Sequence, residues 1–377
     1  MAPVVSSWLK PRFAWATGFT LIRDPNQRVP VVVGEDSVAP LASANFRRRQ
    51  IGAALDLARL VGETGGGTLG GALRALLPAD VSLTRERRST FDRLAAGPDL
   101  RYQLGLGEVG EFRERDGVLA TTAMETRTLT GSAGARLPVG LTVRGTYRDT
   151  DGTTWVLQGD GQARLAQHTR EWPSGSLAWS ARPGGALGRA VSSLNAQAQY
   201  RVSETRVRQG VAGDGRVVPA AGAVTESRVR LFTPSLTIAW RPGITTGAQY
   251  GQSRTDLTAT GSTTRNDRVD WGGNLSFAFR APRSLARLPN PIRTVLSGSA
   301  SDTRACLMRA GTSACTPVAD SRRSQFDARM DTGVSATVVG GASFSYILTD
   351  QRHLSSRFTQ YVFTVFAEIN FVTGRAP

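Results

Sequence analysis

The chain has 377 residues, 40% hydrophobic content and a mean hydropathy of −0.20, and it contains no apolar run approaching the roughly 18 residues of a membrane-spanning helix, which excludes a helical membrane protein. Its net charge of +16 comes almost entirely from arginine, since Lys10 is the only lysine. The arginines are spread singly and have no interleaved aromatic residues, which argues against a nucleic-acid-binding protein.

Segments of period-two alternation recur along the chain. A strand points successive side chains to opposite faces, so alternation gives each face its own chemistry. One side of each segment is apolar, and the other carries Arg, Asn, Gln, Thr and Gly. The alternating segments are 12–21, 51–58, 139–148, 194–202, 271–280, 334–338 and 361–371. A strand with one hydrocarbon face and one wet face is the pattern of a transmembrane β-barrel.

The sequence therefore predicts an all-β fold, namely an antiparallel transmembrane β-barrel, or a large segment of one, of about 14 strands. Residues 1–377 form a single barrel domain or the C-terminal segment of a larger barrel. A soluble, basic all-β binding protein is an alternative, because a sandwich also alternates. On the polar side, the candidates to face the lumen are Arg144, Gln197, Asn274, Arg280, Glu368 and Asn370.

The first half of the chain is less regular. Leucines at helical spacing in 68–77, followed by Pro78, predict a short periplasmic helix or turn insertion within 61–78. Segments 81–91, 100–106 and 119–136 are candidate strands, but accepting all of them puts Leu137-Pro138 at the wrong rim. We therefore expect 100–106 to be an inward-folded segment or a shortened strand.

Short and long connections alternate along the second half. Pro and Gly predict short turns at 182–185, 241–243 and 340–341. Long polar loops are expected at 149–170, 204–226, 254–265 and 302–322. In outer-membrane barrels the short turns are periplasmic, so the last strand is predicted to run toward the periplasm. The arginine clusters 47–49 and 322–323 are interpreted as a solvated rim or as contacts to lipopolysaccharide phosphates.

The cysteines and histidines indicate a structural disulfide and no catalytic or metal site. Cys306 and Cys315 lie in one polar segment, and a disulfide between them is favoured over a metal site, because neither His168 nor His353 has ligand-like spacing to them. These are the only two histidines, so few combinations of residues could form a catalytic triad. We expect no enzyme activity, no cofactor and no metal.

The segment Met1–Leu9 lacks the basic and apolar regions of a signal peptide. Either a signal lies on a longer parent chain, of which this is a C-terminal piece, or the start codon is misplaced. The onset of a strand at Arg12 favours the longer parent chain.

Three stretches together resemble the late barrel strands of SprA-type cell-surface proteins, the translocons of type IX secretion and gliding motility. They are Trp8–Phe13 with Leu21–Asn26, Pro78–Phe91, and Asp320–Arg323 leading to Phe344–Tyr346 and the last strand. The resemblance implies a protein-conducting pore in the outer membrane at the cell surface, with secreted cargo, plug or gating proteins and the remaining strands of a parent barrel as partners. Outer-membrane lipid and lipopolysaccharide are also expected partners. A self-contained porin or outer-membrane transporter is the alternative function.

Overall fold

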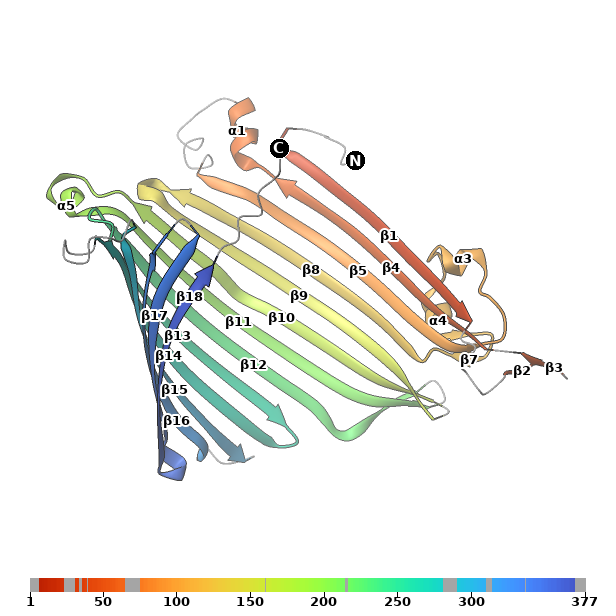
Figure 1. The fold of residues 1–377 in the computed structure, drawn as a ribbon. Helices are drawn as coiled ribbons and strands as arrows, with labels where there is room; N and C mark the ends of the chain where they lie inside the picture. Colours follow the sequence, from red (N-terminus) through yellow and green to blue (C-terminus); the bar gives the residue numbers. More distant parts are fainter. Residues whose placement is uncertain are drawn as a thin grey trace.

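The computed structural model describes residues 7–23, 31–33, 36–38, 40–64, 75–159, 161–213, 216–280, 290–309, 314–335 and 337–369. Fourteen strands form one antiparallel sheet in which sheet neighbours follow one another along the chain (Figure 1). They are β1 (Leu9–Arg23), β4 (Leu41–Leu55), β5 (Leu76–Leu94), β8 (Thr122–Leu137), β9 (Leu141–Gln158), β10 (Gly161–Ala181), β11 (Val191–Gly213), β12 (Arg216–Trp240), β13 (Thr245–Ala259), β14 (Ser262–Phe279), β15 (Ile292–Arg309), β16 (Thr316–Gly333), β17 (Val338–Gln351) and β18 (Ser356–Ile369). The predicted fold class is confirmed.

The sheet is strongly curved and open (Figure 1). Strands β1 and β18 form its two edges, and within the described residues neither has a strand partner on its outer side. The start of β1 and the end of β18 lie at the same end of the sheet, which also carries the connections from β4 to β5 and from β8 to β9 (Figure 1). The direction of the last strand relative to the periplasm stays a prediction.

The cross-strand registers assign every side chain of the sheet to one of two faces. We call the face that carries Trp15, Leu177, Trp271 and Phe363 the belt face, and the opposite one the polar face. On the belt face, the half nearest the chain ends is apolar and exposed; its side chains include Phe13, Ile51, Val81, Val143, Leu177, Tyr200, Leu236, Trp271, Phe326, Phe363 and Val365. This apolar belt takes up about ten residues of each strand, or about 25 Å once strand tilt is allowed for, which matches the lipid-facing band of a membrane barrel.

The apolar belt ends at a row of charged side chains that crosses the sheet, which we call the charged boundary. Its members, one for each strand from β4 to β18, are Arg49, Arg85, Arg127, Asp149, Arg170, Glu204, Arg230, Arg254, Asp267, Asp302, Arg322, Asp350 and Arg357. Several of them pair with charges on neighbouring strands. Arg254 lies 2.5 Å from Asp267, and Arg228 lies 3.2 Å from Glu204. Beyond this boundary both faces of the strands are largely polar.

The long loops predicted from composition are wrong. The stretches 149–170, 204–226, 254–265 and 302–322 lie largely within strands that extend the sheet as tall hairpins. Many of the described residues there are charged or carry a hydroxyl on both faces, as Thr205 and Arg206 do on β11, so these stretches lack the apolar alternation of the membrane-spanning half. Their strands are held by backbone pairing and by cross-strand ion pairs such as Arg265–Asp256, at 2.7 Å.

The predicted strand at 334–338 and the predicted turn at 340–341 are also wrong. Gly340 and Gly341 lie inside β17, and the turn precedes them. The Ser335 hydroxyl accepts hydrogen bonds from the backbone N–H groups of Thr337 and Val338, at 3.2 and 3.1 Å, which closes the turn locally. The hydrogen bonds to the Ser335 hydroxyl therefore favour a turn here, although the alternation of apolar residues predicted a strand.

The connection from β4 to β5 contains helix α1 (Leu57–Thr64). Of the predicted insertion at 61–78, residues 65–74 lie outside the described residues, and Leu76 already begins β5. Helix α5 (Gly185–Ala190) forms the turn predicted at 182–185, and a tight turn follows Trp240 as predicted at 241–243. Among the described residues, no helix has the length and apolar character needed to cross a membrane.

Cys306 of β15 and Cys315, which precedes β16, form the predicted disulfide, with their Cα atoms 5.5 Å apart. The sequence separation is nine residues, so the bridge closes a short loop. We expect replacement of both cysteines by serine to destabilise this hairpin by roughly 2 to 3 kcal/mol. Thermal unfolding with and without a reductant measures the effect. An equal unfolding temperature for the oxidised protein and the double variant would contradict it.

Candidate functional site

A small hydrophobic core covers the belt face of β1, β4 and β5 beyond the apolar belt. The connection between β5 and β8, residues 95–121, contains α3 (Leu100–Gln103), α4 (Val109–Arg113) and the short strands β6 (Glu114–Arg115) and β7 (Val118–Leu119). Its Tyr102 is fully buried against Phe91, and the Phe19 ring meets it edge-on at 6.3 Å between centroids. The Tyr102 hydroxyl hydrogen-bonds with that of Ser89 at 2.6 Å. Segment 100–106 is therefore a helix and turn folded back onto the sheet on its belt face, and the predicted alternative of a shortened strand is wrong.

The start of α3 is fixed by a charged cap. Asp99 is the N-cap, and its carboxylate accepts hydrogen bonds from the Tyr102 N–H and from Arg115, the latter at 2.9 Å. The Arg115 guanidinium, helped by the backbone N–H groups, holds the pKa of Asp99 below its ordinary value. Burial raises the pKa of Tyr102, so this hydroxyl remains protonated and continues to bond Ser89. The connection is thus anchored by polar as well as apolar contacts.

The Asp99 cap gives this connection a pH dependence of known sign. A carboxyl whose pKa is lower in the folded state stabilises that state at pH values above its unfolded pKa, about 3.9, and the effect is lost as the pH falls through the folded value. We expect residues 95–121 to become protease-sensitive in that acid range. Asp99→Asn should remove this part of the pH dependence, and limited proteolysis across pH 2 to 6 tests it. An unchanged acid profile in the variant would count against the assignment.

Next to this core lies a pocket of about 460 Å³ lined by arginines from two neighbouring strands. Arg47 and Arg49 project from β4, and Arg85 and Arg87 project from β5; we call these residues with the 106–110 backbone the arginine pocket. The register places Arg47 opposite Arg87 and Arg49 opposite Arg85. Like charges directly opposite each other destabilise a sheet unless a group of opposite charge lies close to them.

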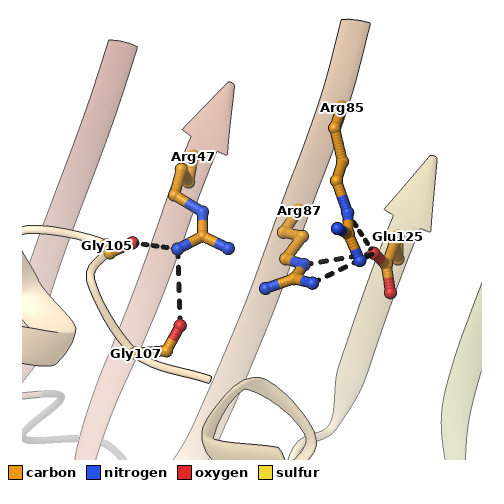
Figure 2. A network of polar contacts seen from close by, with 6 residues as sticks. All are labelled: Arg47, Arg85, Arg87, Gly105, Gly107 and Glu125. Atoms are coloured by element: carbon orange, nitrogen blue, oxygen red, sulfur yellow. Dashed lines mark hydrogen bonds and ion pairs between the residues drawn. The ribbon is translucent and has the colours of Figure 1, made fainter. Parts of the chain in front are cut away.

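Figure 2 shows how this charge is partly compensated. Glu125 of β8 accepts hydrogen bonds from Arg85 at 2.6 Å and from Arg87 at 3.2 Å. Arg47, which is only 5% exposed, instead donates to the neutral carbonyl oxygens of Gly105 and Gly107. The carbonyls orient this guanidinium without cancelling its charge.

Arg49 is held by an aromatic ring. Its guanidinium carbon lies 4.2 Å from the centre of the Trp15 ring, within the range of a cation–π contact. Its Nε is buried and has no hydrogen-bond partner among the described residues. Glu108 also lines the pocket, so its lining carries the four arginines against this carboxylate and the shared Glu125. The pocket is chemically suited to an anion with several acceptor oxygens.

The polar face carries the predicted lumen residues. Strand registers place Arg144, Gln197, Asn274 and Glu368 all on this face. Gln197 lines a groove of about 750 Å³ together with Gln199, Gln249, Arg268, Asp270, Arg323 and Gln325. Arg280 follows the end of β14 and is exposed, and Asn370 lies outside the described residues. The groove is lined mainly by amides, hydroxyls and charges, which bind water and polar solutes.

His168 does not lie in a loop as predicted. It lies in β10 on the belt face, where its Nδ1 is 2.7 Å from Asp151 and its Nε2 is 3.5 Å from Asp149. The ligand atoms of these residues lie within 4.8 Å of one another, as in a metal site. However, Arg127, Arg170 and Arg206 are their register neighbours, and these charges oppose a bound cation. We therefore interpret the group as an ion-pair cluster.

Sequence reasoning identified half of the arginine pocket. Arg47 and Arg49 belong to the cluster 47–49, which was placed beside a strand end but lies within β4. Arg48 points to the opposite face. Arg85 and Arg87 were missed, because only the register between β4 and β5 brings them opposite the first pair. The sequence pattern that could have identified them is the Arg-x-Arg spacing at 47–49 and at 85–87, which puts two arginines on one face of each strand.

No protein-family model matches this sequence. No curated protein matches it either. Among solved structures, the alcaligin outer-membrane receptor FauA of Bordetella pertussis matches with a TM-score of 0.35 and 12% identity over 96% of this chain and 63% of that one. The ferripyoverdine receptor of Pseudomonas aeruginosa matches with a TM-score of 0.33 and 9% identity over 98% of this chain and 58% of that one. Pseudomonas aeruginosa OccK9 (OpdG) matches with a TM-score of 0.26 and 13% identity over 96% and 98%. The chain thus spans about 60% of the length of the two receptors.

Proposed function

We propose that this chain forms part of the wall of an outer-membrane β-barrel and that polar cargo passes along its polar face. The observation that carries this proposal is the chemical difference between the faces of one continuous sheet. The belt face has an exposed apolar belt that ends at the charged boundary, and the polar face carries amides, hydroxyls and charges along the strands. A sheet of this kind separates lipid from water. The role is non-enzymatic.

The finer proposal is a segment of a wide, protein-conducting pore of the type IX secretion kind. It is supported by the two unpaired edges, β1 and β18, within the described residues. An unpaired edge in lipid leaves backbone groups without hydrogen-bond partners, so both edges need partner strands, which this proposal assigns to a larger barrel. A barrel completed in this way has more than 14 strands, and barrel diameter grows with strand number. Secreted polypeptides, with plug or gating proteins, are the corresponding cargo and partners.

Cysteine cross-linking in outer membranes tests closure. In a background lacking Cys306 and Cys315, Ala14→Cys is combined in turn with cysteine at Gln360, Thr364 and Glu368, all on the polar face. The matched positive control is Ala14→Cys with Gln50→Cys, which are register partners. A wall segment gives cross-links only in the control pair. Cross-links between β1 and β18 would instead establish a self-contained porin or transporter, and absence of the protein from the outer-membrane fraction would overturn both functions.

A further inference from the structure

We propose that the arginine pocket binds the phosphate group of an anionic lipid headgroup in the outer leaflet, while the acyl chains of that lipid lie along the adjacent apolar belt. This inference rests on the proposed membrane location. It assigns a lipid site to the belt face, separate from the path of the cargo on the polar face.

The charge of the pocket is the first support. Four guanidinium groups from two strands line the pocket, and Glu108 is the carboxylate in the same lining. Only Arg85 and Arg87 bind Glu125 of the neighbouring strand. Arg47 is buried on neutral carbonyl oxygens, and the buried Nε of Arg49 has no partner. A phosphate offers several acceptor oxygens, and a guanidinium binds it through paired N–H groups. Such a ligand would offset the repulsion between the opposed arginines.

Position on the sheet is the second support. Arg49 and Arg85 are the β4 and β5 members of the charged boundary, and the next belt-face residues toward the chain ends are Ile51 and Leu83. Successive side chains on one face lie about 7 Å apart, so the apolar belt begins one side chain away from the guanidinium groups. A bound lipid needs positive charge for its headgroup phosphate and, next to it, an apolar surface for its acyl chains.

Contrast with the rest of the charged boundary is the third support. From β9 to β18 the boundary carries arginines and carboxylates in equal number, and some of these charges pair across neighbouring strands, as Arg254 does with Asp267 and Glu204 does with Arg228. On β4, β5 and β8 the boundary members are all arginines, and the register places Arg49, Arg85 and Arg127 side by side. The excess positive charge is therefore concentrated at the place where the 95–121 connection adds a wall to the pocket.

The test compares lipid retention by matched variants of the full chain. Arg49→Gln with Arg85→Gln removes two charges from the pocket, and Arg228→Gln with Arg254→Gln removes two paired charges from the same face. Binding is measured with phosphatidylcholine nanodiscs doped with lipid A, with undoped nanodiscs and with inorganic phosphate. We expect the pocket variant to bind lipid A at least tenfold more weakly than the unaltered protein, since each lost guanidinium removes charge-assisted hydrogen bonds to the phosphate. The control variant should bind normally.

Several results would overturn the proposal. They are equal loss in both double variants, no preference for lipid A over undoped nanodiscs, and binding of inorganic phosphate with no binding of lipid A. Arg49→Lys with Arg85→Lys guards against a folding defect, because it keeps the charge but loses the paired N–H geometry; binding between that of the unaltered and glutamine forms is expected. Membrane insertion without binding of lipid A would refute only the lipid site. Failure of the chain to insert into membranes would refute the proposed function.

Discussion

An arginine at Leu236 is expected to reduce assembly of the chain into membranes by roughly 30-fold or more, whereas an arginine at the adjacent Ser235 is expected to leave assembly nearly unchanged. Leu236 lies in the apolar belt of β12 between Ala196 and Ala248, and Ser235 lines the groove of the polar face. An arginine on the lipid face near the bilayer centre costs about 2 to 4 kcal/mol, while a lumen position tolerates it.

Heat-modifiable gel migration after folding into lipid vesicles measures this difference. The two substitutions lie one residue apart on the same strand and introduce the same side chain, so they differ only in the face that receives it. Equal impairment by both variants would contradict the assignment of the belt face to lipid. Equal tolerance would indicate that neither face contacts hydrocarbon.

Phe91→Ala is expected to detach the 95–121 connection from the sheet. The Phe91 side chain is fully buried with Tyr102, Leu94 and Trp155, and truncating such a side chain costs about 3 to 5 kcal/mol. Because the connection can open locally while the sheet remains paired, the measurable loss is capped by the free energy of that local opening. Proteolysis within 95–121 should therefore accelerate strongly without loss of sheet structure.

The matched control is Phe13→Ala, which removes the same side chain from the same face at a position that is 63% exposed. Its effect on protease sensitivity of the connection should be negligible. Both variants are compared by mass spectrometry of the cleavage products and by circular dichroism. Unchanged cleavage in Phe91→Ala would show that the aromatic cluster does not hold the connection in place.

The membrane-spanning half of the sheet was predictable because its chemistry alternates. Segments such as 139–148 and 194–202 separate apolar from polar side chains with period two, and the structure pairs them as β9 and β11 with their neighbours. The tall hairpins were not predictable in this way. Residues such as Arg206 and Glu226 face each other in register on strands that are polar on both sides, so composition alone resembles a loop.

The arginine pocket depends on information that no single segment contains. Arg47 and Arg87 are far apart in sequence, and a register shift of one residue would place one pair on the opposite face. The connection that walls the pocket is equally non-local, because Tyr102 finds its partners on β1, β4 and β5. Periodicity identifies the strands, but packing between distant segments decides which side chains meet.

The order of strands in the sheet has a consequence for how the chain folds. Every pairing in the 14-stranded sheet joins sheet strands that are consecutive along the chain. Most hairpins therefore form by closing a connection of a few residues, whereas the connections after β1, β4 and β5 are longer, and the sheet has a low contact order for its size. Growth can begin at any hairpin and add one strand at a time, with each new edge acting as the template for the next strand.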